Sequence, residues 1–128
     1  MKALCLLVLG MGIFAVPSAA QAQTSSPSYT QAQAQAGAEL YAQNCAMCHG
    51  DATAGRTLVK PGTSPTVGGI FGIMVTNMPL NQPGSLSHEQ YENIMAFALQ
   101  KNGYLAGNQA LHYNQTLTNS RAFVNKPQ

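Results

Sequence analysis

Two cysteines and a histidine in the sequence Cys45-Ala46-Met47-Cys48-His49 are the residues of this chain with the clearest chemistry. Two thiols three positions apart, followed at once by an imidazole, form the C-x-x-C-H pattern that is typical of covalent haem attachment. Each thiol can add to a haem vinyl group to give a thioether, and the imidazole is then directed at the iron. The motif therefore predicts one covalently bound haem c, attached through Cys45 and Cys48, with His49 as an iron ligand.

Three other kinds of site use similar residues. A thioredoxin-like redox pair is expected beside alternating strands and helices, but the segment before Cys45 has a helical composition. Zinc needs four ligands, and the two cysteines with two of the histidines His49, His88 and His112 could supply them, although no second pair has zinc-finger spacing. A disulfide between the two cysteines is compatible with an exported protein. The complete five-residue motif favours haem over these alternatives.

The iron of such a haem needs a second ligand on its other face, and the candidates are downstream methionines and histidines. Met78 is favoured because Pro79 cannot continue a helix, so an extended segment can present the methionine side chain. Met74 lies one turn earlier in an apolar run, where ordinary core packing is the alternative role. Of the remaining candidates, Met95 is assigned to core packing and His88 to the surface, while His112 lies in the tail without a defined setting. A thioether ligand raises the reduction potential and suits electron transfer, so we predict Met78 as the second ligand.

The N-terminus has the features of a secretory signal peptide. Lys2 supplies a positive charge, residues 4–16 are almost wholly apolar, and residues 20–22 form a small-residue processing site. The apolar stretch is short for a membrane span. We therefore predict cleavage after Ala22, export to the periplasm and a mature protein that does not span a membrane. Cys5 is removed with the signal, which leaves no thiol outside the haem motif.

The composition limits the number of domains and the classes of partner that this chain can have. The 106 residues that follow the predicted signal are enough for one domain. The chain has no tryptophan and few large apolar side chains, and a buried haem would compensate for this. Removal of Lys2 lowers the formal net charge from +2 to +1. No basic patch is available for nucleic acid, and the low charge density predicts weak long-range electrostatic steering.

The first half of the mature chain predicts a leader and a helix. Residues 23–30 are rich in Gln, Ser and Ala and are expected to form a flexible leader, followed by the folded domain over residues 31–128. A helix is predicted over residues 31–49, ending at Gly50. Gly37 is a small residue within that helix and would let a second helix approach closely.

The second half predicts two more helices separated by turns. Residues 51–69 have the glycine and proline content of a loop, and the apolar run over residues 69–77 is assigned to a helix because no second strand pattern could pair with it. A capping box beginning at Ser87 starts the last helix, and Gly103 ends it. The tail over residues 104–128 has no sustained period and is expected to be irregular. The apolar stripe of the last helix comprises Tyr91, Ile94, Met95, Ala98 and Leu99.

These features together resemble the class I c-type cytochromes over most of the mature chain. Residues 37–41 and 45–50 are similar to that family's N-terminal helix and haem motif, and residues 77–79 to its methionine-ligand loop. Residues 91–99 resemble its C-terminal helix, which in the family crosses the N-terminal helix at the glycine, here Gly37. The resemblance implies an all-α, small cytochrome c fold, with three main helices around one covalently bound haem and long loops.

The resemblance also implies a function. It predicts a periplasmic one-electron carrier, not an enzyme, whose haem c is ligated by His49 and Met78. Within the family, the chain is similar to cytochromes associated with periplasmic quinoprotein alcohol dehydrogenases, so the expected redox partners are a quinoprotein dehydrogenase and a terminal oxidase. One alternative is a fixed electron-relay subunit of a dehydrogenase complex. Another is a haem enzyme or sensor with an open sixth site. Such an activity needs acid–base groups near the open iron position, and the sequence offers few, since no acidic residue lies between Asp51 and Glu89.

Overall fold

The fold is known from a computed structural model that describes residues 28–50 and 65–123. Within these ranges the chain is helical, and its one extended pairing is an isolated antiparallel bridge between Thr66 and Ala122. The all-α fold class predicted from the sequence is confirmed. The predicted signal peptide and most of the predicted 51–69 loop lie outside the described residues. The helices are α1 (Gln31–Asn44), α2 (Ala46–His49), α3 (Val67–Asn77), α4 (His88–Lys101) and α5 (Tyr113–Leu117).

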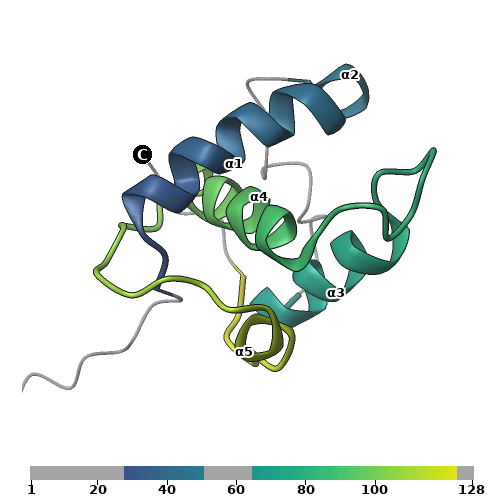
Figure 1. The fold of residues 1–128 in the computed structure, drawn as a ribbon. Coiled ribbons are helices and arrows are strands. Elements are labelled where there is room, and N and C mark those ends of the chain that lie inside the picture. The colour runs from purple at the N-terminus through teal and green to yellow at the C-terminus, as the bar shows by residue number, and fades with distance from the viewer. Residues whose placement is uncertain (1–27, 51–64, 124–128) are drawn as a thin grey trace, which may run out of the picture.

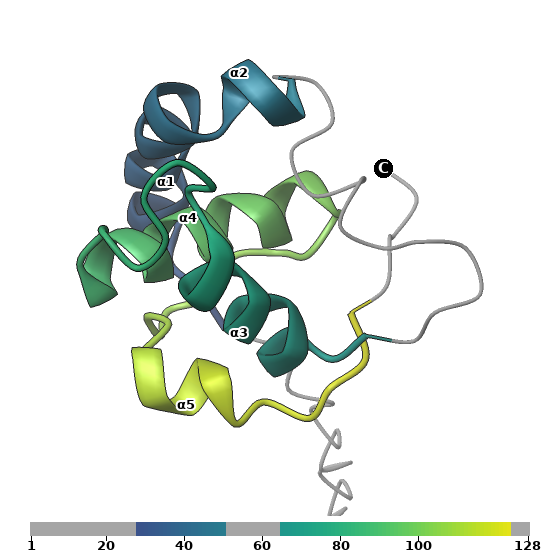
Figure 2. The same ribbon diagram turned by 90° about the vertical axis from the view of Figure 1, so that its right-hand side faces the viewer.

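Helix α4 lies at the centre of the arrangement. In Figures 1 and 2, α1 and α2 lie on one side of α4, while α3 and α5 lie on the other. The capping box predicted at its start is present, since the Ser87 hydroxyl accepts from the Gln90 N–H (3.2 Å) and the Gln90 side chain accepts from the Ser87 N–H (2.8 Å). The backbone turns away after α4 at Gly103, whose φ is +79°. The predicted bounds of this helix therefore agree with the structure.

The crossing of α1 and α4 depends on a glycine. A Cβ atom built at Gly37 would lie 1.8 Å from the carbonyl oxygen of Asn93 and 3.0 Å from the Cβ of Phe97. Such a contact leaves no room for any side chain at this position. The absence of a side chain at Gly37 is thus what lets the two helix backbones come this close.

The first helix differs from its prediction at Cys45. A continuous helix was expected over residues 31–49, but Cys45 leaves helical geometry (φ −128°, ψ −35°) and separates α1 from α2. The Cys45 N–H still donates to the Tyr41 carbonyl (2.8 Å), and the Cys45 carbonyl accepts from the Cys48 and His49 N–H groups. Cys45 therefore ends one helix and begins a separate single turn that carries Cys48 and His49.

The third helix starts earlier than the apolar run suggested. The hydroxyl of Thr66 accepts from the Gly69 N–H (2.9 Å), and this cap places Val67 and Gly68 inside α3. A cap of this kind satisfies a backbone donor that the helix itself leaves unpaired. The helix ends at Asn77, with Met78 as its extended C-cap, as the following proline predicts.

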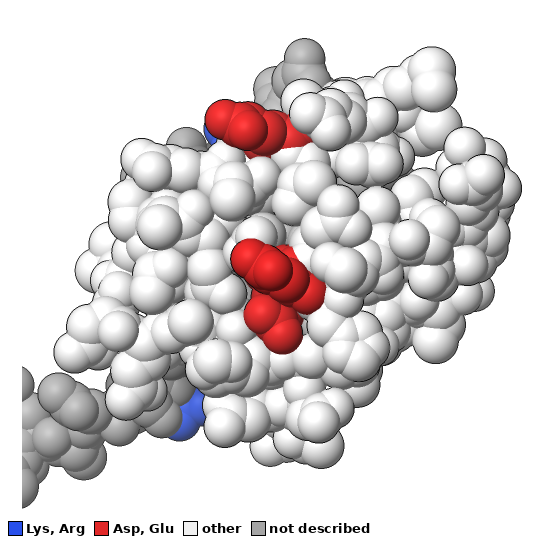
Figure 3. Space-filling model, viewed as in Figure 1, with Lys and Arg blue, Asp and Glu red and all other residues white. Residues whose placement is uncertain are grey.

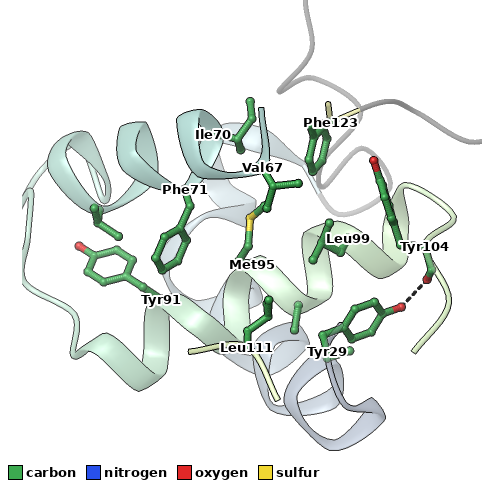
Figure 4. Close-up of a cluster of buried hydrophobic side chains, with 13 residues drawn as sticks. Tyr29, Val67, Ile70, Phe71, Tyr91, Met95, Leu99, Tyr104, Leu111 and Phe123 are labelled. Carbon is green, nitrogen blue, oxygen red and sulfur yellow. Dashed lines mark hydrogen bonds between the residues drawn. The ribbon is translucent and has the colours of Figure 1, made fainter. Parts of the chain in front are cut away.

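The core lies between α4, α3 and the tail. Figure 4 shows this cluster, which includes side chains from each of these parts of the chain. Met95 is fully buried within it, in agreement with its predicted packing role. A second, smaller cluster of Tyr41, Ile94 and Phe97 joins α1 to α4. The main cluster comprises Tyr29, Ala34, Val67, Ile70, Phe71, Val75, Tyr91, Met95, Ala96, Leu99, Tyr104, Leu111 and Phe123.

The C-terminal tail is more ordered than predicted. It was expected to be irregular, but it forms α5 and buries Leu111 and Phe123. The Phe123 N–H donates to the Pro65 carbonyl (2.7 Å), and the Arg121 carbonyl accepts from the Val67 N–H (2.8 Å). The tail therefore completes the core beside the start of α3.

The end of the predicted leader also belongs to the folded domain. Tyr29 is 1% exposed, and its hydroxyl donates to the Tyr104 carbonyl (2.5 Å), the bond drawn in Figure 4. The Tyr29 carbonyl accepts from the Gly107 N–H (2.8 Å). Residues 28–30, which the sequence assigned to a flexible leader, are thus fixed against the chain after α4.

The surface carries few charges. The face seen in Figure 3 is largely uncharged, with acidic side chains gathered in two places. Over residues 28–50 and 65–123, none of the helices has the length and apolar character needed to cross a lipid bilayer.

Replacing Gly37 by alanine tests the helix crossing. The added methyl would collide with the Asn93 carbonyl, so α1 and α4 must separate, and we expect Gly37→Ala to lower the free energy of unfolding by at least about 2 kcal/mol. Gly72→Ala is a matched control, because a Cβ in the middle of α3 meets nothing within 4 Å. It should be neutral or stabilising by up to about 1 kcal/mol. Equal effects of the two variants in denaturant titrations would contradict this account.

Candidate functional site

A cavity of about 550 Å³ brings the four predicted site residues together. Cys45, Cys48 and His49 come from the α1–α2 junction, and Met78 comes from the end of α3, 29 positions after His49. The side chains around the cavity carry no formal charge apart from any on the histidine. The lining residues are Gln43, Asn44, Cys45, Met47, Cys48, His49, Met78, Pro79, Leu80, Asn81, Gln82 and Ser85.

The segment that carries His49 is held at both ends by hydrogen bonds. The Cys45 N–H is bound to the Tyr41 carbonyl, and the Tyr41 hydroxyl donates to the Gly50 carbonyl (3.0 Å). Gly50 has φ +72° and ψ 157°, a region that essentially only glycine occupies. One buried tyrosine of α1 thus contacts the backbone on both sides of the motif.

The two thiols differ in their surroundings. Cys45 is half-buried and Cys48 is exposed, and they do not form a disulfide with each other. Burial raises the pKa of the Cys45 thiol, and the neighbouring Cys48 raises it further, because both effects disfavour the thiolate. The zinc alternative finds no support in residues 28–50 and 65–123, where no three His, Cys, Asp or Glu side chains gather as a metal site would require.

Met78 is fixed through its backbone on both sides. Its N–H donates to the Met74 carbonyl (3.0 Å), and its own carbonyl accepts from the Tyr91 hydroxyl (2.6 Å). Pro79 beside it is buried, while the residues over 80–85 are exposed. Met78 itself is half-buried and lines the cavity.

The contact of Tyr91 with Met78 was not predicted from the sequence. Tyr91 was assigned to the apolar stripe of the last helix, a role that concerns its ring. Its hydroxyl reaches a backbone carbonyl 13 positions earlier in the chain. The one signal in the sequence was a tyrosine at a position predicted to be buried, because a buried tyrosine hydroxyl needs a hydrogen-bond partner.

The other candidate ligands lie away from the cavity. Met74 is half-buried and packs against both apolar clusters, and Met95 is completely buried. The His88 ring stacks on Tyr113, with 3.6 Å between ring centroids and 11° between planes. His112 is exposed at the start of α5. None of these four candidate ligands lines the cavity.

The residues around the cavity fit a covalently attached haem. Two thiols at C-x-x-C spacing with an imidazole beside them are the groups that covalent attachment uses, and a thioether from another segment completes the His/Met ligand set of cytochromes c. The cavity volume falls within the range usual for cofactor sites. Pro79 and Leu80 add apolar surface, and Met47 contributes a side chain that is 96% exposed at the rim.

Comparisons with known proteins give two matches. The model of the family described as cytochrome c oxidase, cbb3-type, subunit III matches residues 32–97, which is just over half of the chain and includes the motif and Met78. Among solved structures, the sulfane dehydrogenase SoxCD from Paracoccus pantotrophus aligns at 22% identity and a TM-score of 0.49, over 89% of this chain and 68% of that chain. No curated protein matches the chain significantly.

Proposed function

The chain belongs to the class I c-type cytochromes, which are haem proteins of electron transfer, and on that premise we propose that it is a periplasmic one-electron carrier. In this proposal one haem c would be attached through Cys45 and Cys48, and His49 and Met78 would ligate its iron. The signal-like pattern over residues 1–22 supports export to the periplasm.

The observation that carries the proposal is the shared cavity. Met78 faces the same space as the three motif residues, whereas Met74 and Met95 pack elsewhere. A pair of iron ligands needs side chains from two segments, and among the residues that the structure describes Met78 is the only methionine outside the motif to line the cavity. Supply of the second ligand by the protein favours electron transfer over chemistry at an open iron site.

The protein's own part in the function is positional. A bound haem supplies a one-electron iron couple whose potential depends on its axial ligands. Tyr41 and Gly50 fix the backbone beside His49, while α3 and Tyr91 fix the backbone of Met78. Ligands held in this way need little movement between redox states, which keeps the reorganisation on electron transfer small.

The rim of the cavity suits brief contact with a partner. Met47 and Leu80 are 96% and 77% exposed, and the side chains around them are apolar or uncharged. We propose that redox partners, such as a quinoprotein dehydrogenase and a terminal oxidase, dock here through a small apolar and polar interface.

A second candidate function is a fixed electron-relay subunit of an oxidoreductase complex, such as a dehydrogenase. The description of the matching family, which names a subunit of an oxidase, favours it. The native mass of the haem-loaded protein separates the two candidates. A monomer supports the free carrier, and stable co-purification with a larger redox protein supports the relay.

Met78→Ala tests the second ligand. The oxidised wild type should show the weak long-wavelength absorbance band of sulfur bound to ferric haem, and the variant should lose it. The reduced variant should also bind carbon monoxide, because the sixth position is open. Met74→Leu is the control and should keep the band, since Met74 packs against the apolar clusters and does not line the cavity. Retention of the band in Met78→Ala would move the ligand elsewhere and refute this part of the proposal.

Serine substitutions test the attachment residues. Haem should stay with the wild-type polypeptide when it is denatured in acidified organic solvent, and should be extracted completely from the Cys45→Ser/Cys48→Ser double variant. Each single variant should retain one thioether and give an intermediate spectrum of the pyridine adduct. Retention of haem by the denatured double variant would show that other residues hold it.

The uncharged rim predicts a weak response to salt. Raising the ionic strength from about 0.01 M to about 1 M shortens the Debye length from about 30 Å to about 3 Å. We expect the electron self-exchange rate, measured by NMR line broadening in mixtures of oxidised and reduced protein, to change by less than about threefold. A change of tenfold or more would mean that charge controls the encounter.

A further inference from the structure

The hydroxyl of Tyr91 points to a role beyond core packing. It donates a 2.6 Å hydrogen bond to the carbonyl of Met78, a residue that lines the cavity. We propose that Tyr91 is the positioning residue for the sixth ligand and that its hydroxyl keeps Met78 from being displaced by outside ligands. This inference rests on the proposed ligation by Met78.

The Met78 segment needs such an anchor. Residues 80–85 are exposed, and the turn they form is held by short-range bonds from Gln82 N–H to the Pro79 carbonyl (2.9 Å) and from Ser85 N–H to the Gln82 carbonyl (3.2 Å). Those bonds lie within the turn and do not tie it to the rest of the fold. A segment with few buried contacts opens at low free-energy cost.

Two bonds from different helices fix the backbone of Met78. Its N–H is bound to Met74 in the last turn of α3, and its carbonyl is bound to Tyr91 in the first turns of α4. The end of a helix frays readily, so the bond within α3 alone gives limited restraint. The bond from Tyr91 adds a restraint from a second, independent element.

Tyr91 is itself held rigidly. Its side chain is 2% exposed and belongs to the main apolar cluster with Phe71 and Met95. It follows directly after the capping box of Ser87 and Gln90, which fixes the start of α4. The hydroxyl is therefore presented from a fixed point of the core, and its bond restrains Met78 more than it restrains Tyr91.

Ligand exchange measures this restraint. An outside ligand binds the iron only when Met78 has left, so its apparent dissociation constant depends on the population of the open state. A hydrogen bond of ordinary net strength changes that population by about 2- to 10-fold. Tyr91→Phe removes the hydroxyl and keeps the ring, so the apolar packing is preserved.

The experiment is an imidazole titration of the oxidised, haem-loaded protein, followed through loss of the sulfur–iron band. Tyr29→Phe is the matched control. Tyr29 is also buried in the main cluster and donates its hydroxyl to a backbone carbonyl, but it lies away from the cavity. We expect Tyr91→Phe to bind imidazole about 2- to 10-fold more tightly than the wild type, and Tyr29→Phe to stay within about twofold of it. Carbon monoxide binding to the reduced proteins gives a second measurement. Tyr91→Phe should again bind more tightly than the wild type, and Tyr29→Phe should again stay close to it.

The outcomes separate the possible failures. Wild-type imidazole affinity in Tyr91→Phe, with the band intact, would overturn the inference while leaving Met78 as the ligand. Equal tightening in Tyr91→Phe and Tyr29→Phe would also overturn it, because the effect would then follow general stability. Absence of the band from the wild type, or its persistence in Met78→Ala, would overturn the assignment of Met78 and the inference with it.

Discussion

The close crossing of α1 and α4 at Gly37 is the constraint on which the rest of the structure depends. Helix α1 leads into the haem motif at its C-terminal end, and the first turns of α4 carry Tyr91, which holds Met78. The distance between these helices therefore sets the distance between the two segments that face the cavity. Because a Cβ at Gly37 would lie 1.8 Å from the Asn93 carbonyl, any side chain there would push these segments apart.

The two segments that line the cavity are both held through their backbones. Tyr41 donates its hydroxyl to the carbonyl after His49, and Tyr91 donates its hydroxyl to the carbonyl of Met78. Each tyrosine has its ring in an apolar cluster and its hydroxyl on a segment next to the cavity. This division suits an aromatic side chain with one polar end. It fixes the backbone of the two segments that line the cavity and leaves their own side chains out of these bonds.

Local sequence signals predicted the helix ends and helix faces that particular residue types mark. The capping box at Ser87, the break at Pro79 and the apolar stripe of α4 all correspond to the structure. The interruption at Cys45 was missed, because its neighbours have helical propensity and nothing local marks a change of direction there. The tail was missed for a different reason. Leu111 and Phe123 are isolated apolar residues without a period, and they became core residues only because α3 and α4 offer surface to cover.

The sequence by itself determined the chemistry of this protein: the paired thiols and imidazole of the motif, the membership of the c-type cytochromes and the short set of candidate second ligands. Such information is local, since it depends on residue types at fixed spacing along a few turns of chain. The tertiary structure decided which methionine faces the cavity, which tyrosine holds it and how the leader and the tail close the core. These outcomes depend on contacts between residues up to 81 positions apart, as in the bond from Ser28 to Gln109, and no local spacing encodes them.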